Sequence, residues 1–119
     1  MLFRSIVNAI KTNSRGSTPP FLLSFEIFNF NVHNCLVDSG ASTNVMPLSV
    51  CKKLNIRPEK IGTKIIQLDR SQVPAVGELN NVIIRLSSDS RIYQCIDIVV
   101  VYIPEAYSLL LSRDWSNKL

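Results

Sequence analysis

Residues 34–47 read NCLVDSGASTNVMP, and this stretch places a carboxylate between an apolar strand and a glycine turn. The apolar run that ends at Val37 delivers Asp38 to a position where water is scarce. Gly40 lets the backbone approach without a Cβ clash, so that nearby N–H and hydroxyl groups can orient the carboxylate oxygens. Asp-Ser-Gly is also a common turn, so the string alone leaves open an ordinary turn without a chemical role.

The residues before this stretch predict a linker and two strands. Residues 11–20 are polar and end in Pro19-Pro20, which separates a leader over 1–20 from a domain over 21–119. Leu23, Phe25 and Ile27 alternate with polar residues, which is the period of a half-buried strand. A turn over 29–31 then leads into a second strand over 32–37.

The residues after it predict one short helix and further strands. Pro47 suits a first helical turn, and Leu48, Cys51 and Leu54 follow at helical spacing, so a helix is expected over 47–55. Runs over 64–68 and 78–86 flank the polar residues 69–72, which is typical of a long hairpin with an exposed tip. Beyond a turn over 88–90, a central strand over 92–103 and a short strand over 109–111 are expected, and a polar turn follows over 112–115. Many short strands and one short helix indicate an all-β barrel or sandwich.

The amino-acid composition indicates one packed domain and does not indicate a nucleic-acid-binding protein. The chain of 119 residues is 46% hydrophobic and 18% charged, which fits one packed domain. Its net charge of +4 is spread along the chain without a basic stripe interleaved with aromatics. Direct binding of nucleic acid is therefore not expected.

The cysteines and the single histidine argue against a metal site. Three cysteines at 35, 51 and 95 form no CxxC pair, and His33 has no second imidazole beside it. An odd count without a secretory signal indicates reduced thiols and a cytoplasmic location. Residues 1–10 are too short and too polar for a signal or a membrane span. A triad of His33 with Asp38 and Ser39 or Ser42 is not expected, because no serine lies on a strand-to-helix elbow.

Two strings together resemble a known family. NCLVDSGASTNVMP over 34–47 and YSLLLSRDWSNKL over 107–119, with the predicted elements between them, resemble the retropepsins. The resemblance is closest to the protease domain of gypsy-type long-terminal-repeat retrotransposon polyproteins, and it runs from about Phe21 to Leu119. It implies a closed acid-protease barrel and the activity of an aspartic endopeptidase, with neither a metal nor an organic cofactor.

The resemblance also implies roles for individual residues. Asp38 corresponds to the catalytic acid, and the hydroxyl of Ser39 would brace the two active-site loops of a dimer, with Gly40 and Ala41 completing the loop. The second string implies support of that loop by four residues: Leu110, Leu111, Ser112 and Arg113. Ser112 stands where the family has glycine, which puts the packing of the loop in question. Viral relatives pair the arginine with an acid where this chain has Ser42, so a backbone contact or an exposed pair with Asp114 is expected for Arg113 instead.

The hairpin corresponds to the family's substrate-covering flap, over residues 64–77. Its tip, Leu68, Asp69, Arg70 and Ser71, lacks the glycine that most members carry there. Gly77 fits a glycine on the returning strand of relatives, or it marks a bulge.

One Asp-Ser-Gly string per chain supplies half of an aspartic-protease site, so a C2 homodimer is expected. Residues 116–119 predict a poor strand, so this dimer should be weak. The resemblance implies that the substrate is an extended peptide within the element's own Gag–Pol polyprotein. Relatives usually continue past Leu119, which is compatible with the chain being a fragment.

Two alternatives remain open. One is a catalytically inactive retropepsin-like domain acting as a dimerisation or binding module, which Ser112 and the glycine-free hairpin tip favour. The other is a cellular ubiquitin-linked shuttle protein that contains a retropepsin domain.

Overall fold

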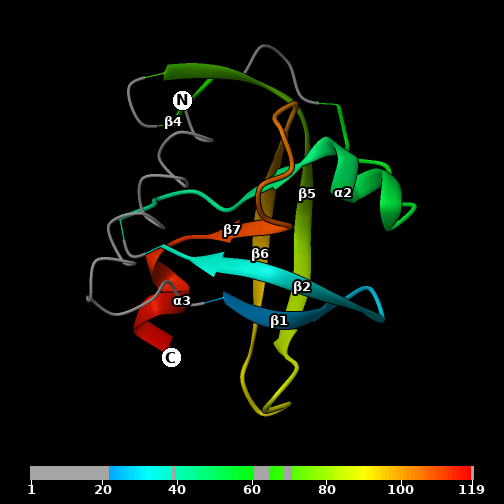
Figure 1. Cartoon of the computed structure of the whole chain (residues 1–119), viewed down its shortest axis with the longest axis vertical. Helices are drawn as coiled ribbons and strands as arrows, with labels where there is room; N and C mark the ends of the chain where they lie inside the picture. The colour runs from blue at the N-terminus through cyan, green and yellow to red at the C-terminus, as the bar shows by residue number, and fades with distance from the viewer. Residues whose placement is uncertain (1–21, 39, 61–64, 69–70, 119) are drawn as a thin grey trace.

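The computed structural model describes residues 22–38, 40–60, 65–68 and 71–118, and the leader over 1–20 lies outside them. The described residues form a mostly β structure with two short helices (Figure 1). The strands are β1 (Leu22–Ile27), β2 (Phe30–Val37), β3 (Val45–Pro47), β4 (Ile65–Leu68), β5 (Ser71–Leu86), β6 (Tyr93–Val101) and β7 (Leu109–Leu111), and the helices are α2 (Leu48–Lys53) and α3 (Arg113–Lys118). Neither helix is long and apolar enough to cross a membrane.

Six of the described strands close into a barrel. The sheet runs in the order β1-β2-β7-β3-β6-β5-β4, and a further pairing of β1 with β5 joins its two sides. The strand β4 stays outside the ring and pairs with the first part of β5 as a hairpin, at the top of Figure 1. The pairs β2–β7 and β3–β6 are parallel, whereas the other pairings are antiparallel. The short strand β7 therefore lies between β2 and β3, although more than sixty residues separate it from either.

The layer of β2, β7 and β3 has an apolar cluster on each face. Alternation along β2 sends Cys35 into the main core and Leu36 to the opposite side, and along β7 it separates Leu111 from Leu110 in the same way. We call the second group the hairpin-side cluster. Its buried members are Leu36, Val45, Ile66, Val99, Val101, Tyr107 and Leu110, and Ala41, Val73, Ala75 and Ile103 pack against them.

The first turn and the hairpin differ from the expected boundaries. The turn consists of Phe28 and Asn29, both with positive φ, because Ile27 pairs with Phe30 across a two-residue loop. It lies one residue earlier than predicted. The returning strand of the hairpin begins at Ser71 rather than at 78, because β5 bends at two register shifts and continues through the polar residues.

The predicted helix is shorter than expected. The helix α2 begins at Leu48 and ends at Lys53, while Pro47 is the last residue of β3, a strand that the sequence pattern did not predict. With φ at −62° and ψ at 143°, Pro47 is extended and precedes the first helical turn.

The polar turn expected over 112–115 is wrong, because α3 begins at Arg113. This second helix buries Trp115 completely in the main core. The Trp115 ring meets Phe25 edge-on, with the ring centroids 4.9 Å apart. Such an aromatic pair adds to the stabilisation that burial of the two rings provides, which accounts for a helix in so short a polar segment.

Candidate active site

The strand β2 delivers Asp38 to the end of the β2–β7–β3 layer. Val37 pairs with Leu111 of the parallel strand β7, and the Asp38 N–H donates to the carbonyl oxygen of Leu111 at 2.9 Å. The Asp38 side chain is half-buried. The backbone at the carboxylate is thus held by β7 at the point where the chain leaves the sheet.

The glycine turn orients the carboxylate itself. The Gly40 N–H donates to Asp38 Oδ1 at 2.9 Å, and the Ala41 N–H donates to the Asp38 carbonyl at 3.1 Å. A Cβ on Gly40 would lie 3.3 Å from Asp38 Oδ1, which is tighter than most Cβ contacts. Absence of a side chain therefore lets the backbone donor approach the acid. Ser39, the predicted brace between two loops, lies outside the described residues.

The structure brings the second string against the first. Leu110 and Leu111 lie within β7, next to β2, and the Arg113 N–H donates to the Ala41 carbonyl at 3.0 Å. The Ser112 N–H donates to Asn44 Oδ1 at 2.9 Å. The loop that follows Asp38 is therefore fastened at both of its ends to the residues that follow β7.

Ser112 stands where the resemblance implies a glycine. It is 3% exposed, and with Asn44, Asp97 and Asp114 it lines a hollow of about 340 Å³. Its N–H keeps the hydrogen bond to Asn44, so the backbone contact of this position is made with serine in place.

The Arg113 side chain takes neither of the contacts expected for it. It is exposed, and it forms no ion pair with Asp114 and no side-chain hydrogen bond to a backbone carbonyl of the described residues. The contribution of Arg113 that the structure shows comes from its backbone N–H.

Asn44 is a supporting residue that the sequence pattern did not single out. Besides accepting from Ser112, its side chain donates from Nδ2 to the Asp97 carbonyl at 3.0 Å, and its own carbonyl accepts from the Val99 N–H at 2.9 Å. One residue therefore connects the Asp38 loop, the end of β7 and the strand β6.

The hairpin covers the hairpin-side cluster. Ile66 of β4 is buried in that cluster, and Val73 and Ala75 of β5 pack against it. Of the predicted tip, Leu68 pairs with Ser71, while Asp69 and Arg70 lie outside the described residues. The cluster also contains Leu36 and touches Ala41, which precede and follow Asp38 in the chain, so it forms an apolar wall that includes part of the Asp38 loop.

The structure explains why residue 77 is a glycine. It is buried next to a register shift of β5, and a Cβ there would lie 2.7 Å from Pro58 Cβ and 3.0 Å from the Glu59 carbonyl oxygen. Glu59 and Glu78 exchange two backbone hydrogen bonds of 2.9 Å at this point. The bulge interpretation is therefore correct, and close approach of the 58–59 segment requires the glycine.

The single histidine and the candidate metal ligands complete the inventory of reactive side chains. His33 Nδ1 lies 2.7 Å from Ser24 Oγ at an exposed position on β2. No group of three residues able to hold a metal ion occurs among the described positions.

Comparisons with known proteins identify the fold. No protein-family model matches the sequence, and no curated protein matches it. Solved structures do match. The retroviral protease-like domain of Ddi1 from Leishmania major is 17% identical with a TM-score of 0.60, and the match covers 85% of this chain and 76% of that one. The protease of EIAV, solved with the inhibitor HBY-793, is 20% identical with a TM-score of 0.64, and the match covers 84% of this chain and 88% of that one. The chain has the retropepsin-like aspartic protease fold, which confirms the predicted fold class, with α3 as an additional helix.

Proposed function

We propose that this chain is an aspartic endopeptidase that works as a homodimer, with Asp38 of each subunit as the catalytic acid. The observation that carries the proposal is the hydrogen bond from the Gly40 N–H to Asp38 Oδ1, on a loop fastened to β7 within a retropepsin-like fold. Hydrogen bonds to the charged form of a carboxylate orient it and stabilise its charge.

The need for a dimer follows from the chemistry. An aspartic protease uses two neighbouring carboxylates that share one proton, because like charges at that distance do not both ionise. The sequence contains a single Asp-Ser-Gly string. A two-fold axis beside the Asp38 loop would supply the second carboxylate from an identical chain.

In the proposed reaction the ionised carboxylate removes a proton from a water molecule, which attacks the scissile carbonyl. The protonated carboxyl of the partner donates a hydrogen bond to that carbonyl oxygen, and a carboxyl then protonates the leaving amine. No covalent intermediate forms, and neither a metal ion nor an organic cofactor takes part.

The proposed substrate is an extended polypeptide held between the hairpin and the Asp38 loop. The hairpin-side cluster supports this, because it forms an apolar wall from residues that precede and follow Asp38 in the chain, and such a wall would favour apolar side chains near the scissile bond. We propose the Gag–Pol polyprotein of a gypsy-type retroelement as that polypeptide, cleaved in the cytoplasm.

Cleavage by an Asp38→Asn variant tests the proposal. The purified chain and the variant are compared on a fused polyprotein segment, with cleavage followed by mass spectrometry. The parent should cleave, also in the presence of EDTA, and the variant should lose activity by a factor of about 10³ or more, because its amide cannot act as the base. The variant should stay folded, because an amide oxygen still accepts from the Gly40 N–H.

Asp89→Asn is the matched control, since Asp89 lies in the turn between β5 and β6 and its carboxylate pairs with Arg91 of the same turn. It should leave cleavage unchanged. Equal cleavage by the parent and by Asp38→Asn would remove the aspartic-protease assignment, and a folded parent without any cleavage would favour the binding-module alternative.

A further inference from the structure

Tyr107 brings a polar atom into the hairpin-side cluster. Its side chain is 6% exposed and belongs to the hairpin-side cluster, together with Leu36 and Leu110. Its hydroxyl is buried and has no hydrogen-bond partner among the described residues. Burial also raises the pKa of Tyr107 above its ordinary value, so the hydroxyl stays protonated and keeps its capacity to donate.

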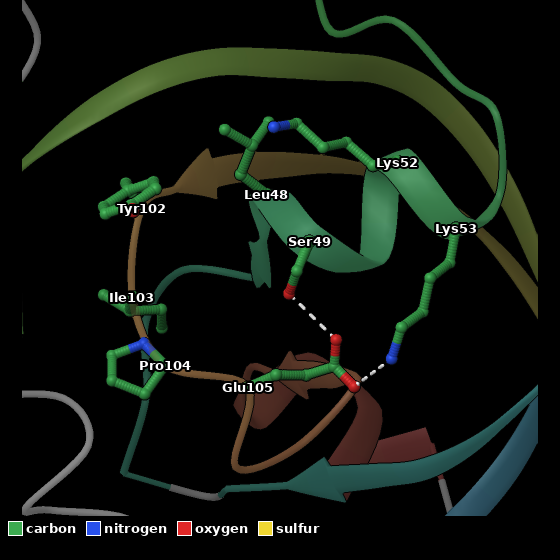
Figure 2. Close-up of a pocket in the computed structure, with 8 residues that line it drawn as sticks. All are labelled: Leu48, Ser49, Lys52, Lys53, Tyr102, Ile103, Pro104 and Glu105. Carbon is green, nitrogen blue, oxygen red and sulfur yellow. Dashed lines mark hydrogen bonds and ion pairs between the residues drawn. The ribbon is translucent and has the colours of Figure 1, made fainter.

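Contacts on both sides of Tyr107 fix its position. On the side towards β7, the Ser108 N–H donates to the Asn34 carbonyl at 3.0 Å. On the other side, Glu105 accepts from Ser49 Oγ at 2.8 Å and pairs with Lys53 Nζ at 2.6 Å, both on α2 (Figure 2). The segment that carries Tyr107 is therefore tied to β2 and to α2.

A buried hydroxyl without a partner is costly, and most such groups in native proteins are paired. The cover over this cluster comes from the hairpin, through Ile66, Val73 and Ala75. In the proposed complex, a peptide held between the hairpin and the Asp38 loop would replace part of that cover. The side chain that the peptide presents to the cluster would then decide whether the Tyr107 hydroxyl gains a hydrogen-bond partner.

We propose that Tyr107 is a specificity-determining residue whose hydroxyl hydrogen-bonds the side chain of one substrate residue near the scissile bond. The site would then favour a residue with an amide or hydroxyl end, such as asparagine or threonine, at that one position. Aliphatic residues of the same shape, leucine or valine, leave the hydroxyl unpaired. This inference rests on the proposed protease function and assigns a side-chain class to the same site.

Paired peptides test the preference. The chain and its Tyr107→Phe variant are assayed on peptides in which each position around the cleaved bond carries either leucine or asparagine, or either valine or threonine. At one position, the ratio of kcat/KM for the polar peptide to kcat/KM for the aliphatic peptide should fall about tenfold in the variant. The reason is that only the parent has a hydroxyl that can hydrogen-bond the polar side chain. Tyr102→Phe is the matched control, since Tyr102 lies on the same connection but is 80% exposed, and its ratios should equal those of the parent.

Thermal unfolding of the free chain supplies a second readout that does not depend on activity. Tyr107→Phe removes an unpaired buried hydroxyl and keeps the ring, so its unfolding midpoint should equal or exceed that of the parent. A lower midpoint would show that the hydroxyl is already paired in the free protein and would overturn the inference. Cleavage by both proteins with unchanged ratios would overturn it while the protease proposal stands. A parent that cleaves no peptide would overturn the proposed function, and this inference with it.

Discussion

The cysteines lie in different surroundings, and their reactivity should follow. Burial raises the pKa of Cys35 to about 12 and that of Cys51 to about 11, whereas Cys95 is exposed on β6. The thiolate is the reactive form, so iodoacetamide at mildly alkaline pH should label Cys95 alone in the folded chain. Mass spectrometry of the labelled protein should show one adduct before unfolding in urea and three afterwards.

The buried thiols of Cys35 and Cys51 predict a loss of stability at high pH. Their folded-state pKa values lie above the ordinary value of 9.0, so their contribution to stability is complete below that pH and is lost as the pH rises towards 11 and 12. Rapid labelling of all three cysteines in the folded chain at neutral pH would contradict the burial of Cys35 and Cys51.

Single residues also show which contacts can be predicted from the sequence and which cannot. Asp38 and Gly40 stand next to each other in a recognisable string, so the local contact between carboxylate and turn could be expected. Asn44 could not, because the partners of its side chain lie 53 and 68 positions further along the chain. No local pattern reports hydrogen bonds at such a separation.

At the scale of an element, the bend of β5 depends on Gly77. An alanine there would place its Cβ against Pro58, whose ring is rigid, and against the Glu59 carbonyl. The segment cannot move away without loss of the paired backbone hydrogen bonds between Glu59 and Glu78. Gly77→Ala should therefore lower the free energy of unfolding by about 1–3 kcal/mol, the usual cost of overpacking.

Urea unfolding followed by fluorescence measures this change, because Trp115 is the single tryptophan and is completely buried. Val76→Ala is the control on the same strand. The Val76 side chain is 40% exposed, so its loss should change the free energy by about 0.5 kcal/mol or less. Equal stability of Gly77→Ala and the parent would mean that the close approach to Pro58 is not needed.

The sequence pattern missed two short elements, β3 with three residues and α3 with six. Length alone does not explain this, because β7 and α2 have the same lengths and were predicted from an apolar run and from helical spacing. Both β3 and α3 form because tertiary contacts stabilise them. Val45 pairs with both Val99 and Leu110, and Trp115 packs on Phe25. The longer strands β1, β2 and β6 carry enough alternating or β-branched residues to be predicted within a few positions.

At the scale of the whole molecule, the pairing of segments that are far apart in the sequence fixes the position of the Asp38 backbone. Propensity indicated strands but not that β7 would lie parallel to β2, which is the arrangement that brings Leu111 to the Asp38 N–H. The resemblance of the two strings to the retropepsins implied that the second string supports the Asp38 loop, but not this pairing of strands. Match to solved retropepsin-like structures confirms the fold, while the roles of Asp38 and Arg113 remain predictions.

The last prediction concerns assembly, because one Asp-Ser-Gly string leaves a single chain with half of an aspartic-protease site. Cleavage per chain should therefore rise with protein concentration below the dissociation constant of the dimer and level off above it. Sedimentation over the same range of concentrations should show the dimer fraction rising in parallel.

Two copies joined by a flexible linker should keep their activity on dilution, because the second subunit is then present at a high effective concentration. The matched control is a linked pair with Asp38→Asn in one copy, which should be inactive at the dilutions where the unmutated linked pair stays active. Constant specific activity from a chain that sediments only as a monomer would rule out a shared pair of carboxylates.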